Sequence, residues 1–279
     1  MKAQGIANDM AYDPGVALEF FKSAGKAEDV ARGATVFAEK EHEIPLLKRN
    51  KMYLLLKGDV GLLAGGKPIG AVKAGEIFGE LALISHAPRS ASAVAKTACR
   101  VIALDEKEFH RALAAKPAFA LMLMSMMIRR LRETITQLSA AGALSKDEAW
   151  KEAAAFDRGQ LADLARGLAD DPPLFYRAGD AILARGQTGL RMYAVLEGRV
   201  AVSIDGRVIE KLGPGGVFGE AALISQSARL AGAQAETDCE LLPIGRSAFL
   251  ALVKLSPEFA DTMLTSLAER LRFLTARLN

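Results

Sequence analysis

A long internal repeat constrains the fold of this chain more than any other feature. The segment FGELALISHAPRSASAVAKTAC, residues 78–99, returns as FGEAALISQSARLAGAQAETDC, residues 218–239, at an offset of 140. The same offset pairs other residues of the two halves: Tyr53 with Tyr193, Gly75 with Gly215, Phe109 with Phe249 and Pro117 with Pro257. Two copies are too few for a solenoid, which needs many stacked repeats. The repeat therefore predicts a duplicated globular domain.

The two copies differ in length at one place. Gly33 matches Gly179 at an offset of 146, so repeat 1 carries about six extra residues before Tyr53. The insertion falls within Lys40–Lys51, a charged segment that contains Pro45. We expect a solvated hairpin extension here; a cover over a ligand and a contact with a partner are the alternatives.

Each copy has the pattern of short strands followed by a helix. Short apolar runs broken by glycines are typical of antiparallel strands with tight turns. These runs are Met52–Leu56, Val60–Leu63, Ile69–Val72 and Val101–Leu104 in repeat 1, and Met192–Leu196, Val200–Ile204, Val208–Leu212 and Glu240–Ile244 in repeat 2. Proline suits the first turn of a helix, which predicts closing helices over Pro117–Leu138 and Pro257–Asn279. The predicted fold class is mainly β with flanking helices.

The domain organisation follows from the repeat. The length of 279 residues suffices for two domains, and 51% hydrophobic residues suffice for a core in each. We predict domain 1 over residues 16–138, a helical linker over 139–173 and domain 2 over 174–279.

Composition excludes several classes of protein. A net charge of +3 is too small to argue for a nucleic-acid partner. Cys99 and Cys239 lie far apart in the sequence, which favours a reducing cytoplasmic location over a disulfide framework. The N-terminal residues lack the apolar core of a signal peptide. The apolar run Ala118–Ile128 is shorter than the roughly 20 residues that span a bilayer, which indicates a buried helix and no membrane contact.

No catalytic or metal-binding motif is present in the sequence. Walker loops, HExxH motifs and nucleophile elbows are absent, and the three histidines, His42, His86 and His110, are scattered. We expect no enzyme, no catalytic residue, no metal and no cofactor. His86 is replaced by Gln226 in repeat 2, which favours a surface position for its side chain.

The segment Phe78–Ala91 has the residue types of an anion site. Gly79 permits close backbone approach, and Leu81–Ser85 is long enough for one helical turn, whose first N–H groups attract an anion. Arg89 can form charge-assisted bonds to phosphate oxygens. Glu80 can accept a hydrogen bond from a ribose hydroxyl. A cation for a phosphate beside a carboxylate for a hydroxyl suits a nucleotide.

Repeat 2 retains this pair as Glu220 and Arg229, at the same spacing. The alternative interpretation is a surface ion pair, which contributes little to stability. Retention of both residues in both copies, within an otherwise apolar segment, argues against that alternative.

These segments resemble the phosphate-binding cassette of the cyclic-nucleotide-binding domain family. The family pattern F-G-E-(L/I)-A-L followed by P-R-x-A stands here as Phe78–Leu83 and Pro88–Ala91. Repeat 1 is similar to the regulatory domain of the catabolite activator family, and the tandem arrangement is similar to the regulatory subunit of cyclic-AMP-dependent protein kinase. The resemblance implies two tandem β-roll (jelly-roll) domains with flanking helices.

The resemblance also implies the site residues. Glu80 is expected to contact the ribose 2′-hydroxyl, Arg89 and Ser90 the cyclic phosphate, and Thr134 on the closing helix the adenine. The expected site 1 consists of Phe78, Gly79, Glu80, Leu81, Ala82, Pro88, Arg89, Ser90, Ala91 and Thr134. The expected site 2 consists of Phe218, Gly219, Glu220, Ala221, Ala222, Arg229, Leu230 and Ala231.

Repeat 2 departs from the family pattern at three positions. Pro88 is replaced by Ala228, Ser90 by Leu230 and Thr134 by Leu274. We expect site 1 to bind cyclic AMP (cAMP), with cyclic GMP (cGMP) as the alternative that only Thr134 disfavours. Site 2 is expected to be weaker, of different base preference, or empty.

The expected function is a non-enzymatic sensor that couples nucleotide binding to helix movement and to an unidentified protein effector. About 22 residues follow Pro257, so no DNA-binding domain is expected after the closing helix. A helix-mediated homodimer is a further expectation. The alternative function is a protein-interaction scaffold in which one or both nucleotide pockets are degenerate.

Overall fold

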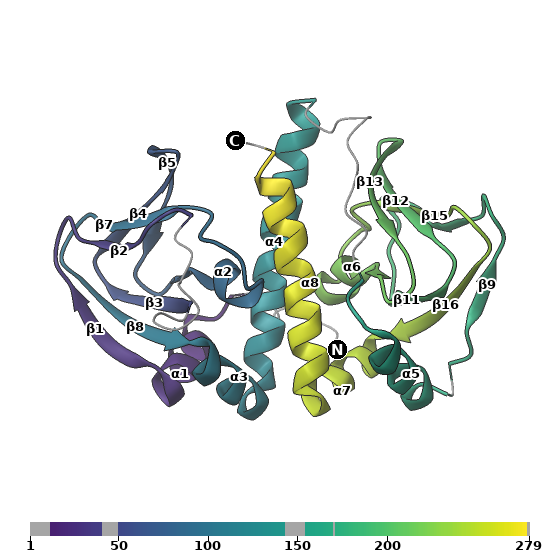
Figure 1. Ribbon diagram of the computed structural model, residues 1–279, viewed down its shortest axis with the longest axis horizontal. Helices are drawn as coiled ribbons and strands as arrows, with labels where there is room; N and C mark the ends of the chain where they lie inside the picture. Colours follow the sequence, from purple (N-terminus) through teal and green to yellow (C-terminus); the bar gives the residue numbers. More distant parts are fainter. Residues whose placement is uncertain (1–11, 41–49, 143–153, 170, 278–279) are drawn as a thin grey trace, which may run out of the picture. The chain divides into compact units, whose positions relative to one another are not determined.

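The computed structural model describes residues 12–40, 50–142, 154–169 and 171–277 (Figure 1). The chain separates into two compact units. The first β-roll unit contains Tyr12–Leu123 and Ser256–Arg272, and the second β-roll unit consists mainly of Met124–Leu255. The predicted insertion over Lys40–Lys51 lies largely outside the described residues, so its role stays a prediction.

The first β-roll unit is a two-sheet structure with antiparallel strand pairs. Its sheets have the strand orders β1-β8-β3-β6 and β2-β7-β4-β5. The strands are β1 (Lys26–Val30), β2 (Thr35–Phe37), β3 (Lys51–Lys57), β4 (Asp59–Ala64), β5 (Lys67–Lys73), β6 (Ile77–Phe78), β7 (Ser92–Ala95) and β8 (Cys99–Asp105). The helices of this unit that precede Pro117 are α1 (Pro14–Ala24), α2 (Glu80–Ile84) and α3 (Glu106–Ala115).

The second β-roll unit repeats this topology. Its sheets have the orders β9-β16-β11-β14 and β10-β15-β12-β13, which match the first unit strand for strand. The strands are β9 (Leu174–Tyr176), β10 (Ala181–Leu183), β11 (Arg191–Glu197), β12 (Val200–Ile204), β13 (Arg207–Leu212), β14 (Val217–Phe218), β15 (Gly232–Ala235) and β16 (Cys239–Gly245). Its helices include α5 (Arg158–Gly167), α6 (Glu220–Ser225) and α7 (Arg246–Leu255). The predicted fold class, two β-rolls with flanking helices, is confirmed.

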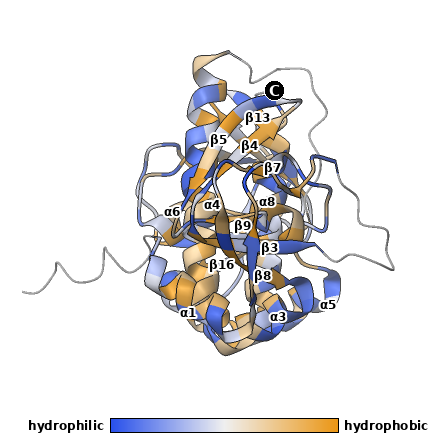
Figure 2. Ribbon diagram, turned by 90° about the vertical axis from the view of Figure 1, so that its left-hand side faces the viewer, coloured by the Kyte–Doolittle hydropathy of each residue, from blue (hydrophilic) through white to orange (hydrophobic). Residues whose placement is uncertain are grey.

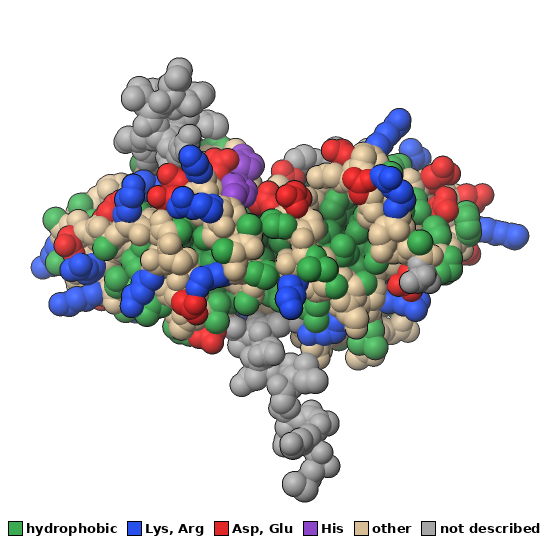
Figure 3. All heavy atoms as spheres, turned by 90° about the horizontal axis from the view of Figure 1, so that it is seen from below, with side chains coloured by type: hydrophobic (Ala, Val, Ile, Leu, Met, Phe, Trp, Pro, Cys, Tyr) green, Lys and Arg blue, Asp and Glu red, His purple; other side chains and the backbone are tan. Residues whose placement is uncertain are grey.

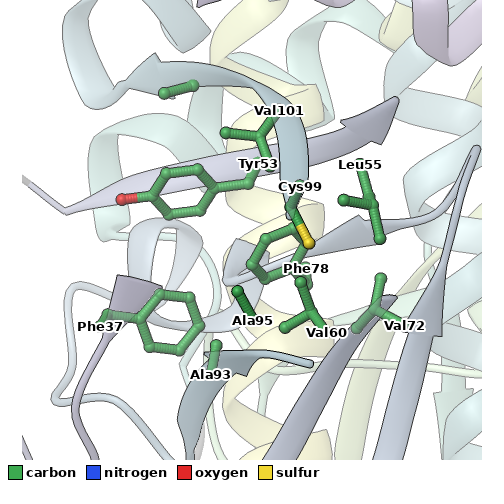
Figure 4. Packing of buried hydrophobic residues seen from close by; sticks show 11 residues of the cluster. Phe37, Tyr53, Leu55, Val60, Val72, Phe78, Ala93, Ala95, Cys99 and Val101 are labelled. Atoms are coloured by element: carbon green, nitrogen blue, oxygen red, sulfur yellow. The ribbon is translucent and has the colours of Figure 1, made fainter. Parts of the chain in front are cut away.

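Alternating side chains of the two sheets form the interior of each roll. In the first unit this core includes Phe37, Tyr53 and Phe78 with smaller aliphatic residues between them (Figure 4). Tyr53 pairs with Phe78 across β3 and β6, and their ring centroids lie 5.1 Å apart. Tyr193 and Phe218 repeat the pair at 5.4 Å. The repeated motif thus places the start of each predicted cassette beside a buried aromatic pair.

Helix α1 closes one end of the first β-roll unit. Asp13 accepts hydrogen bonds from the backbone N–H groups of Gly15 and Val16, and Pro14 occupies the first turn, so the helix begins where capping rules favour it. The helix carries hydrophobic residues, coloured orange in Figure 2, and the side chains of Phe20 and Phe21 are fully buried. The ring of Phe20 stacks on Phe119 with centroids 3.5 Å apart. This aromatic cluster joins α1 to the start of the following long helix.

Each of the two long helices is divided between the two units. Helix α4 (Pro117–Ala140) begins in the first β-roll unit, and its residues from Met124 onward belong to the second. Helix α8 (Pro257–Thr275) belongs to the first unit as far as Arg272. The predicted closing helices are confirmed, with ends at Ala140 and Thr275. The predicted domain boundaries follow sequence order and stay a prediction.

Three helices and several short strands were not predicted. Helices α1, α3 and α7 each span about three turns, and the edge strand β1 has the polar sequence KAEDV with mostly exposed residues. A polar edge strand carries no alternating apolar pattern, because its stability comes from pairing with β8. The predicted inner strands differ from the observed ones by at most two residues at either end, and the strand Val200–Ile204 was predicted with its observed bounds.

Candidate functional site

A left-handed glycine opens each cassette, by which we mean residues 78–91 and 218–231. Gly79 has φ 78° and stands at the N-terminal cap of α2, and Gly219 has φ 85° at the cap of α6. Only glycine adopts this conformation without a steric penalty. The turn brings Glu80 and Glu220 to the first position of each helix, where both carboxyl groups are buried, with 2% and 4% of the residue exposed.

Arg89 is buried within the first cassette and is held by backbone carbonyls. Only 5% of the residue is exposed. Its Nη1 donates to the carbonyl oxygen of Gly79 at 2.8 Å, and its Nη2 donates to that of Lys51 at 2.8 Å. The guanidinium carbon also lies 4.2 Å from the ring centroid of Phe37, a cation–π contact. These contacts fix the orientation of the cation, so that little reorganisation accompanies the binding of an anion.

Arg229 reproduces this arrangement in the second cassette. Its Nη1 donates to the carbonyl oxygen of Gly219 and its Nη2 to that of Arg191, both at 2.6 Å. Burial lowers the pKa of Arg229, and the neighbouring Tyr193 and Glu220 oppose that shift electrostatically. The guanidinium is positively charged at neutral pH, because arginine is effectively always protonated in proteins. A buried carboxylate and a buried cation thus lie close together in site 2.

The surroundings of the two arginines differ. Leu183 stands where the first cassette has Phe37, and a Cβ on Gly189 would lie only 2.1 Å from Nη2 of Arg229, so the glycine backbone packs directly on the guanidinium. The backbone N–H of Arg229 also donates to the carbonyl oxygen of Gln187 at 2.8 Å. Ser90 is exposed, whereas its counterpart Leu230 is half-buried. Backbone therefore packs closely on the second arginine, and a half-buried leucine stands where the first cassette has a hydroxyl.

The structure brings most of the predicted site residues together. Phe78–Ala82 and Pro88–Ala91 lie within the first cassette and in one unit, and Phe218–Ala222 and Arg229–Ala231 lie within the second cassette and in the other unit. Thr134 is buried on the part of α4 that belongs to the second unit, not to the unit that holds site 1. Its assignment to site 1 stays a prediction.

Sequence reasoning missed the groups that orient the two arginines. Lys51 and Arg191 contribute backbone carbonyls, which no side-chain pattern reveals. Phe37 lies more than 50 residues before Arg89 in the sequence, and only the pairing of β2 with β7 brings the two together. The one signal in the sequence for these carbonyl contacts was that Lys51 and Arg191 are equivalent positions of the two repeats, 140 residues apart.

A group of titratable side chains lies beside the first cassette. His86 Nδ1 is 3.6 Å from Glu106 Oε1, and His110 Nδ1 is 3.4 Å from Asp261 Oδ1. Burial raises the pKa of Asp261, and the two histidines oppose that shift. Figure 3 shows histidine side chains at the surface next to acidic ones. The side chain of His86 is 54% exposed, as its replacement in repeat 2 predicted.

The described residues contain no group of three or more His, Cys, Asp or Glu side chains that could hold a metal ion. Within the same part of the chain, no single helix is long and apolar enough to cross a membrane; α3 and α4 pass that test only as a pair bent by 113°. Cys99 and Cys239 are buried free thiols that donate to backbone carbonyls.

Substitution of Gly79 tests how tightly the first cassette holds Arg89. A Cβ at Gly79 would lie 3.0 Å from Nη1 of Arg89 and 3.2 Å from the Lys51 carbonyl oxygen. We expect Gly79→Ala to cost at least about 2 kcal/mol in the free energy of unfolding, since the left-handed backbone alone costs alanine about 1–2 kcal/mol. Gly33→Ala is the matched control, because Gly33 has φ 82° and open space around it. Chemical denaturation measures both, and equal losses would contradict this account.

Comparison with known proteins agrees with this geometry. The family model of the cyclic nucleotide-binding domain matches residues 28–116 and 173–256. The chain is 30% identical over 202 residues to a cAMP-dependent protein kinase regulatory subunit of Eremothecium gossypii, covering 72% of this chain and 39% of that protein. It is 33% identical over 190 residues to the Schizosaccharomyces pombe regulatory subunit, covering 67% of this chain and 41% of that protein. The chain thus spans about two fifths of the length of these curated relatives.

Among solved structures, the catabolite activator protein of Thermus thermophilus is similar, with a TM-score of 0.41 and 24% identity. The likeness covers 60% of this chain and 72% of that one. The two matches to the family model coincide with the two β-rolls and include both cassettes. The chain belongs to the cyclic nucleotide-binding domain family and carries two tandem copies of that domain.

Proposed function

We propose that this protein is a non-catalytic sensor of a 3′,5′-cyclic nucleotide that passes the signal of binding to a protein effector. The observation that carries the proposal is the pair of buried Glu and Arg side chains in each cassette. Each pair stands around a left-handed glycine at the start of a short helix. An ion pair that served only stability would not need to have both partners buried. It also would not need to recur with the same geometry in both repeats.

The chemistry of each pair suits a cyclic nucleotide. A guanidinium that two carbonyls already orient can present its remaining edge to phosphate oxygens, and charge-assisted hydrogen bonds to an anion are among the strongest in proteins. The carboxylate of Glu80 or Glu220 is an acceptor and can take a hydrogen bond from a ribose hydroxyl. One cation and one acceptor in the same cassette favour a ligand that carries both a phosphate and a hydroxyl.

The ligand we propose for site 1 is cAMP. The curated relatives are named as cAMP-dependent regulatory subunits, which supports this base and supports a protein kinase-like effector as the partner. The exposed Ser90 beside Arg89 supplies a hydroxyl to the phosphate, and Thr134 is our candidate for contact with the adenine. Site 2 lacks both groups, which favours weaker binding or another base there. A cytoplasmic location and a homodimer are further parts of the proposal.

Isothermal titration of the purified chain with cAMP and then with cGMP tests the function. We expect heat of binding with at least one site per chain and tighter binding of cAMP. Two sites per chain support a tandem sensor, and one site supports a functional site 1 with a degenerate site 2. Failure to bind either nucleotide, together with an unchanged melting temperature, would overturn the proposal, because any ligand that binds the folded state stabilises it.

The second candidate function is a protein-interaction scaffold with degenerate pockets. The observation that favours it is confined to site 2, where Leu230 replaces a hydroxyl and Gly189 packs on the guanidinium. The same titration separates the two functions, since a scaffold with both pockets degenerate gives no heat with either nucleotide.

A further inference from the structure

Arg132 of helix α4 reaches the cassette of the second β-roll unit. Its Nη2 donates to the hydroxyl oxygen of Ser225 at 3.3 Å, to the hydroxyl oxygen of Ser227, and to the carbonyl oxygen of Ala228 at 2.9 Å. The two serine hydroxyl oxygens lie 2.6 Å apart, so the two serines are hydrogen-bonded to each other as well as to the guanidinium of Arg132. Burial lowers the pKa of Arg132, which indicates that part of this contact is shielded from water.

The residues that Arg132 holds lead directly to the phosphate-binding cation. Ser225 is the last residue of α6, and Ala228 immediately precedes Arg229. A second arginine, Arg246 of α7, donates to the carbonyl oxygen of Leu223 at 2.7 Å. Cations near the C-terminal end of a helix satisfy its unpaired carbonyls. Two arginines from outside the cassette therefore position this region: Arg246 holds helix α6, and Arg132 holds the end of α6 and the loop before Arg229.

Within the part of the chain that the structure describes, the first cassette receives no equivalent arginine contact from its long helix. The counterpart of Arg132, at the offset of 140, is Arg272 of α8, whose Nη1 is buried without a hydrogen-bond partner among the described residues. Ala87 and Pro88 stand where the second cassette has Ser227 and Ala228, so the serine hydroxyl is missing. Helix α8 contacts α2 instead through Thr265, whose hydroxyl donates to the carbonyl oxygen of Ile84 at 3.3 Å. The two cassettes thus differ in how a long helix holds them.

We propose that Arg132 is a positioning residue for site 2, through which helix α4 sets the nucleotide affinity of that site. The inference rests on the proposed function and adds to it that the position of helix α4 regulates site 2. Because α4 begins in the first β-roll unit, a displacement of this helix moves the Ala228 carbonyl next to Arg229. Thermodynamic linkage makes the coupling reciprocal: occupation of site 2 must also stabilise the position of α4.

The test isolates site 2 in an Arg89→Ala parent and compares Arg132→Ala with Arg272→Ala added to it. We expect Arg132→Ala to weaken cAMP binding at site 2 by about 10-fold. This is the effect expected from losing one hydrogen bond with a charged donor. Arg272→Ala is expected to change that affinity by less than about 2-fold, because Nη1 of Arg272 has no hydrogen-bond partner among the described residues. Ser227→Ala in the Arg132→Ala background is expected to add little, since both changes remove the same bond.

Amide hydrogen exchange of ligand-free protein gives a readout that does not depend on nucleotide. We expect Arg132→Ala to accelerate exchange at the amides of Ser227 and Arg229, which donate to Ala222 and Gln187, while those of Ala87 and the first cassette stay unchanged. An Arg229→Ala background, in which only site 1 remains, shows whether the variants are folded. Its affinity for cAMP is expected to be the same with and without Arg132→Ala.

The outcomes separate the inference from the proposed function. Equal site 2 affinity and equal exchange in Arg132→Ala and Arg272→Ala would overturn the positioning role. Absence of any nucleotide binding by the Arg89→Ala parent would count against the proposed function of site 2. In that case the exchange measurement still tests the positioning role. Faster exchange confined to the amides of Ser227 and Arg229 would support the contact of Arg132 with this loop, and unchanged exchange would overturn the positioning role.

Discussion

Arg89→Ala is expected to abolish nucleotide binding at site 1 and to leave site 2 intact. Two charge-assisted hydrogen bonds to a phosphate contribute about 1.5–3 kcal/mol each, so that their loss weakens binding by about 10²–10⁴-fold. The side chain is 5% exposed and fixed by the carbonyls of Gly79 and Lys51, which leaves no other described side chain of the cassette to replace its charge. Calorimetric titration with cAMP measures the stoichiometry and the affinity of the remaining site.

Arg89→Lys is the matched variant that separates charge from geometry. Lysine keeps the positive charge but cannot reproduce two parallel N–H donors together with the two carbonyl contacts. We expect it to recover only a small part of the affinity. Arg229→Ala is the symmetrical change and is expected to affect site 2 alone. Loss of the ligand response by Arg229→Ala and its retention by Arg89→Ala would reverse our ranking of the two sites.

Phe20→Ala is expected to cause the largest loss of stability, about 3–5 kcal/mol in the free energy of unfolding. Phe20 is fully buried and stacks on Phe119 with the ring planes 9° apart. It also makes edge contacts with Phe21 and Phe109, so that a single ring links α1, α3 and the start of α4. Truncation leaves a cavity that neighbouring rings cannot fill without leaving their rotamers. Urea denaturation followed by circular dichroism measures the loss.

Ile69→Ala is the control for this prediction. Ile69 lies on β5 of the same unit and is 51% exposed, so its truncation is expected to change stability by no more than about 0.5 kcal/mol. Equal effects of the two substitutions would mean that the aromatic cluster does not stabilise this unit. Loss of α1 contacts is also expected to reduce cooperativity of unfolding, because this helix joins the roll to α3 and to the start of α4.

Local patterns accounted for much of the fold and of the cassette. The inner strands, the closing helices and the short helix after Gly79 were all predicted from runs of contiguous residues, because turn glycines, proline starts and apolar alternation act over a few positions. Helix α1 was missed although its Asp13–Pro14 start follows the capping rules. Strand β1 was missed because an exposed edge strand needs no apolar pattern.

The sequence by itself determined the duplicated domain, the glycine at the start of each cassette and the two Glu–Arg pairs, since each depends on residue type and spacing within one segment. Only the tertiary structure decided which groups orient the arginines and which helix holds which cassette. The carbonyl of Lys51, the ring of Phe37 and the guanidinium of Arg132 come from distant positions, and backbone carbonyls leave no signature in the sequence. The sequence placed Thr134 with its own repeat, whereas packing places this part of α4 in the second unit. A long apolar helix has several faces to bury, and its partner depends on packing between segments that the sequence pattern does not encode.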